Sequence, residues 1–305
     1  AESYKVAALT PCDVILGTDP DADRVAIAVP DGRGGFHKLS GNELGCLLMQ
    51  YILKTRAERK NIPEGAIVVR SIVSSPLADR IAEKYGVDMH AVLTGFKYIG
   101  EKICLWEESG ENNFLFGYEE SYGCLSGMHT KDKDAVNASM LCCEMTAWYR
   151  EQGMTLAQAM DDLYAEHGCY HNDLGSFTFE GADGMAKMQS IMDTLRTSGP
   201  ADLAGDPVTE TVDYKLGYKG LPKSNVLEFL LGEQGSVIAR PSGTEPKVKF
   251  YYTAVGNTKE DAKAFIGRLE SEEGAVLELN GEDVKITPDM VDVRIDAKEG
   301  FAVAM

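Results

Sequence analysis

Hydrophobic residues along the first half of the chain predict strands that alternate with helices. Apolar runs at 14–16 and 25–29 predict two strands on either side of an acidic loop. A helix that Ser40 or Asn42 could cap is predicted over 43–60, because apolar residues recur there at helical spacing: Leu44, Leu47, Leu48, Tyr51 and Ile52.

The following segments continue this alternation. A helix is predicted over 76–85, and a turn into another helix over 94–103. Strands are predicted at 66–73, 87–93 and 114–118. Because strands that alternate with helices are typical of βαβ units, the sequence predicts a mixed, largely parallel α/β sheet.

Two more helices are predicted before residue 168, one after Asp134 and one after Thr155. The first carries four apolar residues on one stripe: Val136, Met140, Cys143 and Ala147. From Leu174 the pattern changes to short strands around one helix, so a smaller α+β domain is predicted. The strands are expected at 176–179, 208–212, 226–231 and in the two halves of 236–252. The helix is expected over 184–195, with a stripe that packs in the core: Met185, Met188, Met192 and Leu195.

Composition narrows the choice of partners. The 305 residues suffice for two or more domains, and the formal net charge of −18 repels polyanions. The sequence therefore argues against nucleic acid and membrane surfaces as partners. No apolar run approaches the roughly 20 residues of a membrane span. The seven cysteines show no zinc-type spacing and indicate reduced thiols in a cytoplasm.

Three aspartates lie in the loop TDPDADR, residues 18–24. Asp19, Asp21 and Asp23 alternate with small or rigid residues, so their oxygens can converge on a hard divalent cation, most simply Mg2+. An EF-hand is excluded, because it needs Gly and Glu where this loop has Arg24 and Pro30. An aspartyl-nucleophile phosphatase that uses Asp19 and a solvated acidic turn both stay open at this point.

Polar residues also follow two of the predicted strands. Gly95 would let a ligand approach the backbone at the carboxyl edge of the sheet, and Lys97 brings a positive charge there. The turn after 114–118 carries adjacent acids and a hydroxyl, which suit the paired hydroxyls of a sugar. His129 and Lys133, just before a predicted helix, are candidate proton donors or acceptors. For each single residue, ordinary solvated side chains are an alternative.

A basic hairpin lies near the end of the smaller domain. The segment RPSGTEPK, residues 240–247, joins two predicted strands and is followed by Lys249. It places a guanidinium, two hydroxyls, backbone amides and ammonium groups around one bend, and a phosphate dianion needs such charge-assisted donors. The hairpin therefore predicts a phosphate site, with a polar surface turn as the alternative.

Four loops now stand in a fixed order: TDPDADR, TGFKYIGEK, GYEESYG and RPSGTEPK. Together they resemble the α-D-phosphohexomutase superfamily, most closely its bacterial α-phosphoglucomutase and phosphopentomutase-like branch. This resemblance implies four domains around a cleft. Residues 1–35 look like the end of the second domain with its metal loop, 36–168 like the third domain, which recognises the sugar, and 169–270 like the fourth, which binds phosphate.

The resemblance also implies roles for individual residues. Asp19, Asp21 and Asp23 would bind Mg2+ together with a phosphoserine, and Arg24 would lie beside them. Lys133 would act as general acid or base, with His129 near the reacting hydroxyl. Substrate contacts are implied for the other matching positions: Thr94, Gly95, Phe96, Lys97, Glu119, Ser121, Lys131, Arg240, Ser242, Gly243, Thr244, Lys247 and Lys249.

The implied reaction is an intramolecular phosphoryl transfer. A phosphoserine phosphorylates glucose 1-phosphate, the glucose 1,6-bisphosphate reorients, and the other phosphate returns to the serine, which leaves glucose 6-phosphate. The family's serine loop, Ser followed by His, Asn and Pro, is absent from the 305 residues. The sequence therefore predicts a truncated mutase that is inactive alone and lacks its N-terminal domains. A sugar-phosphate binding module without turnover is the alternative, and a pentose phosphate is not excluded as the ligand.

The last segment, 271–305, does not share the resemblance. It alternates like strands at 275–279 and 291–295, and it looks faintly like the C-terminal region of bacterial isoleucyl-tRNA synthetases. We expect this tail to have a separate origin.

Overall fold

The computed structural model describes residues 2–110, 113–179, 181, 183–270, 276–279 and 282–285, the last two ranges by their backbone alone. The chain forms two compact units that divide between His167 and Gly168. Most of the tail 271–305, including the strand expected at 291–295, lies outside the described residues. Its described part is a two-stranded antiparallel hairpin of β15 (Val276–Leu279) and β16 (Glu282–Lys285).

The first unit opens with a helix and a three-stranded antiparallel sheet in the order β1-β2-β3. The first five residues of β2 are all buried, whereas β1, at the edge of this sheet, is only partly buried along its whole length. The acidic loop lies between the paired ends of β1 and β2. The bounds are α1 Glu2–Leu9, β1 Ile15–Thr18, β2 Val25–Pro30 and β3 Phe36–Lys38.

A four-stranded sheet in the order β5-β4-β6-β7 forms the centre of the first unit. β4 is parallel to β5 and β6, and β7 is antiparallel to β6. Because β4, β5 and β6 run the same way, the loops that follow them leave from one edge of the sheet. The bounds are β4 Ile67–Ser71, β5 Asp88–Val92, β6 Phe114–Tyr118 and β7 Cys124–Ser126.

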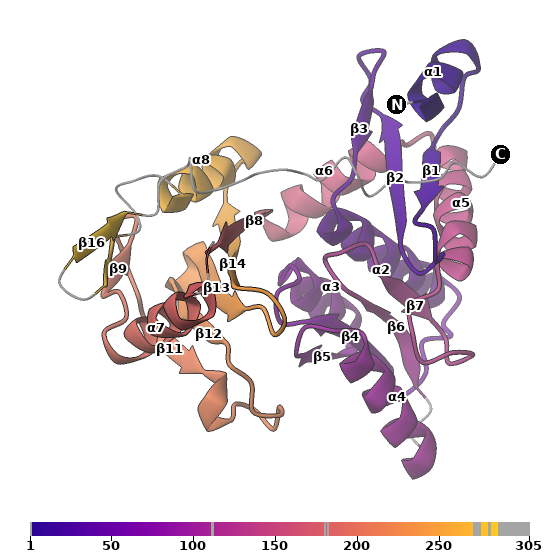
Figure 1. Cartoon of the computed structure of the whole chain (residues 1–305). Coiled ribbons are helices and arrows are strands. Elements are labelled where there is room, and N and C mark those ends of the chain that lie inside the picture. Colours follow the sequence, from indigo (N-terminus) through magenta and orange to yellow (C-terminus); the bar gives the residue numbers. More distant parts are fainter. Residues whose placement is uncertain are drawn as a thin grey trace. The chain divides into compact units, whose positions relative to one another are not determined.

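Helices cover both faces of this sheet (Figure 1). Ile99 and Trp106 of α4 belong to one core cluster with Ile67 and Val92 of the sheet. On the other face Tyr118 meets α2 at Gly45, where a Cβ would overlap the tyrosine ring. The sequence therefore folds into the predicted α/β layers. The helices are α2 Gly41–Glu58, α3 Leu77–Tyr85, α4 Lys97–Ser109, α5 Ala135–Glu151 and α6 Leu156–His167.

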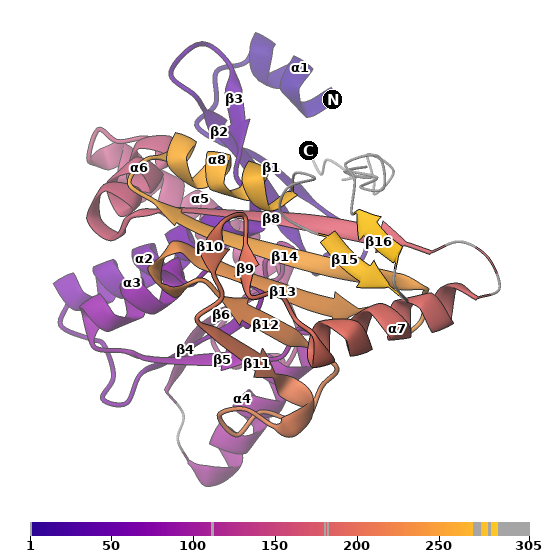
Figure 2. The same ribbon diagram turned by 90° about the vertical axis from the view of Figure 1, so that its left-hand side faces the viewer.

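The second unit is α+β, as predicted. Its five-stranded antiparallel sheet has the order β11-β12-β13-β14-β8 and carries α7 and α8 on one face (Figure 2). Buried residues of both helices share one core cluster with Val237, Val248 and Phe250. The bounds are β8 Cys169–Thr178, α7 Gly184–Thr197, β9 Asp202–Leu203, β10 Asp206–Pro207, β11 Glu210–Asp213, β12 Leu227–Leu230, β13 Gly235–Pro241, β14 Lys247–Gly256 and α8 Lys259–Glu270.

Ser40 is the cap of α2. Its side chain accepts from the Glu43 amide while the Glu43 carboxylate accepts from the Ser40 amide, which satisfies two donors at the helix start. Asn42, the other candidate, instead accepts a hydrogen bond from the Ser75 amide. The helices α1 and α8 and the short strands β3 and β7 were not predicted from the sequence.

The two predicted apolar stripes differ in their burial. Val136 and Met140 of α5 do lie on one stripe with Cys143 and Ala147, but that stripe is exposed, and Leu141 and Met145 face the core instead. In α7 the predicted core stripe holds except at Met185, which is 48% exposed. Both helices carry apolar residues on more than one face, so spacing alone did not select the buried one. No described helix has the length and hydropathy needed to cross a membrane.

Candidate active site

The acidic loop gathers three carboxylates at the tip of the β1–β2 hairpin. One oxygen from each of Asp19, Asp21 and Asp23 lies within 4.8 Å of the others. The loop folds back at Ala22, whose φ of 56° is left-handed and whose amide donates to the Asp19 carbonyl over 3.1 Å. Asp19 is buried, Asp23 is half-buried and Asp21 is exposed. Carboxylates held this close repel one another unless a cation joins them.

Asp19 is held by Arg24. The Arg24 Nε donates to Asp19 Oδ2 over 2.6 Å, and Oδ1 accepts from the amides of Asp23 and Arg24 at 3.2 and 3.1 Å. Burial would raise the pKa of Asp19, but the hydrogen bonds from Arg24 and Asp23 outweigh burial and lower it. Asp19 is therefore an anion that fixes the loop.

One carboxylate oxygen of Asp23 forms an ion pair, and the other has no hydrogen-bond partner in the described residues. Its Oδ2 lies 3.0 Å from the Lys133 Nζ. Its Oδ1 is buried without a hydrogen-bond partner in the described part of the chain, with the Arg24 Nε 3.6 Å away. Buried polar atoms are rarely left unpaired. Three carboxylates, one of them with an unpaired oxygen, fit a hard divalent cation such as Mg2+.

Lys133 lies between two carboxylates, with its Nζ 3.0 Å from both Asp23 and Asp132. Burial opposes its charge, but the hydrogen bonds to Asp132 and Asp23 outweigh burial and raise the pKa of the ammonium. The same Nζ lies 5.5 Å from the centroid of the Phe96 ring. Lys133 is thus held as a cation beside the acidic loop.

Backbone hydrogen bonds join the acidic loop to its neighbours. The Val25 amide donates to the Tyr122 carbonyl over 3.2 Å, and the Ala135 amide donates to the Ala22 carbonyl over 3.0 Å. Gly123 forms an isolated bridge with Arg24, and a Cβ at Gly123 would overlap the aliphatic part of the Lys133 side chain. A glycine is needed here because Lys133 crosses the backbone at close range.

Glu119 connects two of the predicted sugar loops. Its Oε1 accepts from the Gly95 amide over 2.8 Å, and its own amide donates to the Gly123 carbonyl over 2.8 Å. Glu119 is 6% exposed. Burial first, and then the charge of Glu120, raise the pKa of Glu119. The two loops therefore meet around one buried carboxylate.

The other residues of these loops differ in exposure. The hydroxyl of Thr94 is buried without a hydrogen-bond partner in the described residues, and Lys97 and Ser121 are exposed. Phe96 is only 3% exposed and packs in the core cluster under α4, so its ring is a support for the loop. Gly95 has a φ of 122°, which favours glycine.

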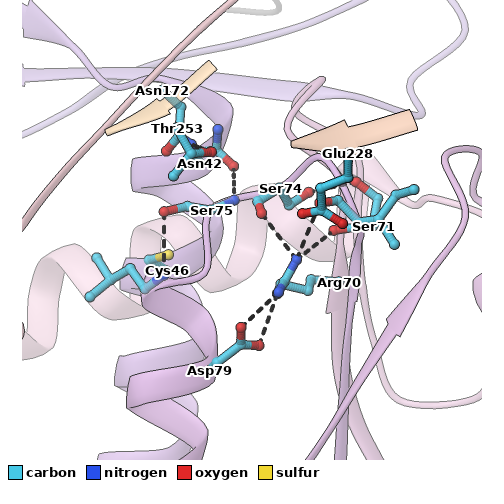
Figure 3. A network of polar contacts seen from close by, with 12 residues as sticks. Asn42, Cys46, Arg70, Ser71, Ser74, Ser75, Asp79, Asn172, Glu228 and Thr253 are labelled. Carbon is cyan, nitrogen blue, oxygen red and sulfur yellow. Dashed lines mark hydrogen bonds and ion pairs between the residues drawn. The ribbon is translucent and has the colours of Figure 1, made fainter. Parts of the chain in front are cut away.

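The structure adds a third segment at this edge, residues 71–75 at the end of β4 and in the loop that follows it, which the sequence analysis did not single out (Figure 3). Arg70 forms a two-bond ion pair with Asp79 at 2.9 and 2.7 Å, and its Nη1 donates to the carbonyls of Ser71 and Ser74 at 3.1 and 3.2 Å. The Ser71 hydroxyl donates to Glu120 Oε2 over 3.1 Å. An arginine near the end of a buried strand, followed by three serines, was the available signal.

His129 and Lys131 are bound to residues other than the three aspartates. The His129 Nε2 lies 2.8 Å from Asp134 Oδ2, while Asp134 Oδ1 caps α5. The Lys131 Nζ donates to Glu107 Oε1 over 2.6 Å and to the Met128 carbonyl over 3.1 Å. Of the predicted proton donors or acceptors, only Lys133 directly contacts the acidic cluster in the described residues.

The predicted phosphate hairpin lies in the second unit, between β13 and β14. Arg240 is paired with Lys249 across the two strands, and Arg240 Nη1 lies 3.5 Å from the Tyr251 hydroxyl. The Ser242 hydroxyl accepts from the amides of Thr244 and Glu245 at 3.4 and 3.3 Å, which closes the turn. Gly243 and Thr244 are exposed, and Lys247 forms a 3.5 Å ion pair with Glu245. The bend therefore presents guanidinium, ammonium, hydroxyl and amide groups together.

Two family models match the chain. "Phosphoglucomutase/phosphomannomutase, alpha/beta/alpha domain III" matches residues 40–167, and "Phosphoglucomutase/phosphomannomutase, C-terminal domain" matches residues 182–265. The chain belongs to the phosphoglucomutase/phosphomannomutase family. This confirms the α-D-phosphohexomutase resemblance seen in the four loops.

Similar proteins agree with this assignment. A phosphoglucomutase of Staphylococcus epidermidis is 38% identical over 261 residues, which cover 82% of this chain and 46% of the relative. A Haemophilus influenzae protein described as a probable phosphomannomutase is 36% identical over 269 residues, covering 88% and 51%. The chain thus spans about half the length of these relatives.

Solved structures share the fold. The open form of parafusin, a phosphoglucomutase of Paramecium, matches with a TM-score of 0.61 at 19% identity and covers 86% of this chain and 45% of its own. A phosphoglucomutase/phosphomannomutase family protein of Burkholderia thailandensis matches with a TM-score of 0.57 at 15% identity, covering 88% and 47%.

Proposed function

We propose that this chain is the metal-, sugar- and phosphate-binding portion of a phosphohexomutase that interconverts glucose 1-phosphate and glucose 6-phosphate through a phosphoserine and glucose 1,6-bisphosphate. The observation that carries the proposal is the convergence of Asp19, Asp21 and Asp23 within 4.8 Å of one another, with Lys133 on Asp23. Family membership supports the reaction class.

Asp19, Asp21 and Asp23 would hold Mg2+. The ion would supply positive charge that stabilises a transferring phosphoryl group. Arg24 fixes Asp19 through its Nε, so it keeps the carboxylates in place as well as adding positive charge. The buried, unpaired Oδ1 of Asp23 supports this assignment, because a cation would satisfy it.

Lys133 would hold the proton that moves to or from the reacting hydroxyl. Its 3.0 Å contact with Asp23 puts the ammonium beside the proposed metal, within reach of a hydroxyl bound there. His129 would have a supporting part, since Asp134 already holds its ring. Both orientations of the bisphosphate could use one Lys133, because the reacting end is always presented to the same aspartates.

The sugar and the second phosphate would be held elsewhere on the chain. Glu119 has one oxygen on Gly95, and with Ser121 it would accept and donate to a pair of sugar hydroxyls. Arg240, Ser242, Gly243, Thr244 and Lys249 would bind the phosphate that is not transferred, with Lys247 partly engaged by Glu245. The family that the four loops resemble often has arginine where this chain has Lys131 and Lys249, and lysine there keeps the positive charge but not the two-bond contact with phosphate.

The nucleophilic serine would come from an N-terminal portion of the same protein. No Ser-His-Asn-Pro loop occurs in the 305 residues, and the chain spans about half of its relatives. The chain alone would then bind phosphosugars without turnover. Its free cysteines suit a reducing cytoplasm.

Two other functions are less well supported. An aspartyl phosphatase needs an accessible nucleophile, whereas both Asp19 oxygens accept hydrogen bonds and the residue is 6% exposed. A binding module without turnover is favoured by one observation only, the missing serine loop. The assay below separates the mutase from the binding module, and release of inorganic phosphate from the same sugar phosphate would reveal a phosphatase.

The test is a coupled assay for conversion of glucose 1-phosphate to glucose 6-phosphate with Mg2+ and glucose 1,6-bisphosphate. The 305-residue chain would be compared with a protein extended through its upstream coding sequence. Activity in the extended protein alone supports the truncated mutase, and Lys133→Met should then remove most of it. Turnover by the short chain would overturn the phosphoserine assignment. Phosphosugar binding without turnover in both proteins would favour the binding module.

A further inference from the structure

Residues 214–225, which join β11 to β12 and are called the lysine loop, differ in charge from the chain as a whole. The loop contains Lys215, Lys219 and Lys223 and no acidic residue, whereas the chain has a net charge of −18. Lys219 and Lys223 are exposed, and Lys215 is half-buried. None of the three ammonium groups forms an ion pair with a carboxylate in the described residues. A local group of cations of this kind attracts anionic ligands.

The lysine loop lies at the same end of the second unit's sheet as the hairpin at residues 240–247. β12 and β13 are antiparallel neighbours, and Leu227, the first residue of β12, is paired with Ala239 near the end of β13. β13 then leads directly into the hairpin. The loop before β12 and the hairpin after β13 therefore leave adjacent strand ends of the sheet shown in Figure 2.

The lysine loop also begins on the face of the sheet that carries Arg240. This face is opposite α7 and α8, because Ala239 belongs to the core cluster under these helices and successive side chains of a strand point to opposite faces. Glu228 lies on the same face as Arg240, since its neighbour Leu227 also belongs to the cluster. The Tyr214 hydroxyl donates to Glu228 Oε2 over 2.8 Å, so it anchors the start of the loop to this face.

Aromatic contacts connect this anchor to Lys219. The rings of Tyr214 and Tyr218 meet edge to face, with their centroids 5.6 Å apart. The Lys219 Nζ lies 4.9 Å from the centroid of the Tyr218 ring. A hydrogen bond with Tyr218 outweighs partial burial and, together with the charges of nearby glutamates, raises the pKa of Lys219. Lys219 is therefore a cation that a continuous series of contacts joins to the face of Arg240.

The backbone of Lys219 has an unusual conformation. Its φ of 46° is left-handed, a region that favours glycine, and the next residue, Gly220, has a φ of 74°. Arg196 of α7 holds both ends of the loop, because its Nε donates to Asp213 Oδ2 and its Nη2 donates to Asn225 Oδ1, each over 2.8 Å. Strained positions in firmly held segments are common at ligand sites.

Resting on the proposed phosphate site at the hairpin, we infer that the lysine loop forms a second wall of that site and that Lys219 binds the phosphate that is not transferred. Arg240 and the hairpin would hold this phosphate from one strand end, and the Lys219 ammonium would hold it from the neighbouring one. Several charge-assisted donors around one dianion increase both affinity and orientation. The lysine loop thus adds a substrate-binding residue that lies outside the hairpin motif.

Isothermal titration calorimetry of the 305-residue chain with glucose 1-phosphate tests this inference without catalysis. The titration contains no divalent cation, because the uncompensated carboxylates of the acidic loop then repel phosphate and the heat reports the hairpin site. Lys219→Met should weaken binding about tenfold, which is the usual effect of losing a hydrogen bond between charged groups. Lys219→Arg keeps the charge and should stay within about threefold of the wild type.

Lys263→Met is the matched control for the lost charge. Lys263 is an exposed lysine of α8, and α8 follows the end of β14 that is opposite the hairpin. The ten residues of β14 span about 30 Å, which is more than a Debye length, so salt screens this charge. Lys263→Met should therefore leave the dissociation constant unchanged.

Lys219→Gly separates binding from folding. Glycine suits a φ of 46°, so this variant should keep the melting temperature of the chain while it loses as much affinity as Lys219→Met. A fall in melting temperature without a loss of affinity would mean that Lys219 only shapes the loop, and it would overturn the inference.

Unchanged binding in Lys219→Met, or an equal loss in Lys263→Met, would also overturn it. Arg240→Met distinguishes this failure from failure of the proposed function. If Arg240→Met abolishes binding and Lys219→Met has no effect, the phosphate site stands without the lysine loop. If neither variant changes the affinity, or if the wild-type chain binds no glucose 1-phosphate, the proposed phosphate site and this inference both fail.

Discussion

The amide of Gly95 and the carboxylate of Glu119 are joined by a 2.8 Å hydrogen bond that connects the ends of β5 and β6. These strands are not neighbours, because β4 lies between them. The bond therefore spans the end of β4, where Ser71 hydrogen-bonds Glu120. Three loops from three parallel strands are held as one surface, and Glu119 is at its centre.

The raised pKa of Glu119 predicts a pH-dependent cost to stability. Because folding raises this pKa, the contribution of Glu119 to stability is complete below its unfolded pKa and is lost as pH rises through the folded pKa. The neutral variant Glu119→Gln does not incur this loss. We expect it to be more stable than the wild type at pH 7, with an advantage that shrinks as the pH falls toward the ordinary glutamate range.

Urea unfolding followed by tryptophan fluorescence measures this effect. The two tryptophans, Trp106 and Trp148, both lie in the first unit, so the signal reports that unit. The exposed residue Glu108 supplies the control Glu108→Gln, whose stability difference should not vary with pH in this way. A Glu119→Gln difference that stays constant from pH 4 to pH 7 would contradict the prediction.

Arg70 should stabilise the loop after β4. The Arg70 side chain is 12% exposed, and Arg70→Met would leave the Ser71 and Ser74 carbonyls without this donor, so we expect a loss of about 1–3 kcal/mol in unfolding free energy. Arg70→Met also leaves the Asp79 carboxylate without its ion-pair partner, but Asp79 is partly exposed, so water can solvate it and this loss costs little. The same tryptophan signal measures the loss.

Arg80, on the same helix as Asp79, provides the control. Its ion pair with Glu83 is exposed, and Arg80→Met should change stability by less than about 0.5 kcal/mol. Equal losses for the two variants would show that the contacts of Arg70 with residues 71–79 add little.

Variants of Asp19 and Asp21 should distinguish the effect on metal binding from the effect on loop stability. Asp21 is exposed and makes no hydrogen bond in the described residues, so Asp21→Asn should keep the fold and lower Mn2+ affinity at least about tenfold, as loss of even an outer partner of a metal site can do. Asp19→Asn should also destabilise the first unit, since it weakens the charged pair with Arg24. Mn2+ shares the oxygen preference of Mg2+ and is followed by electron paramagnetic resonance.

The control for this pair is Asp31→Asn, in the next acidic turn, where the carboxylate accepts from the Arg33 and Gly35 amides. Mn2+ binding should be unchanged in that variant. Unchanged affinity in Asp21→Asn would place the cation elsewhere.

Sequence patterns predicted the regular core but not every choice between faces. The spacing of Leu44 to Ile52 identified α2, and the βαβ alternation identified the parallel sheet, because each pattern has one clear hydrophobic period. In α5 both faces carry apolar residues, and packing of Leu141 and Met145 decided which was buried. α1 was missed because none of its residues is buried and it therefore has no core-facing pattern.

In the candidate site, too, the sequence predicted some features and missed others. Short motifs identified Asp19, Asp21 and Asp23 because they lie within one loop. The contact between Asp23 and Lys133 joins positions far apart in sequence, and it depends on how α5 begins beside the β1–β2 hairpin. The loop after β4 was missed because its serines act through Arg70 and through backbone carbonyls, which no residue pattern displays.

Gly123 should position Lys133. A Cβ at this residue would overlap the Lys133 side chain, so Gly123→Ala should displace the ammonium from Asp23. Because that neighbour is flexible, we expect a modest stability cost of about 1 kcal/mol. In the extended protein, mutase activity should fall by about 10²–10⁴-fold, the usual contribution of a general acid or base.

A double-mutant cycle shows whether the effect of Gly123→Ala passes through Lys133. In a Lys133→Met background, Gly123→Ala should cost little further activity, because the group it displaces is already gone. Gly267→Ala, on α8 with open space around its Cβ position, is the matched control and should leave activity unchanged. Additive losses in the cycle would mean that Gly123 acts on the acidic loop itself, through its bridge to Arg24, and that the ammonium of Lys133 reaches the substrate without this glycine.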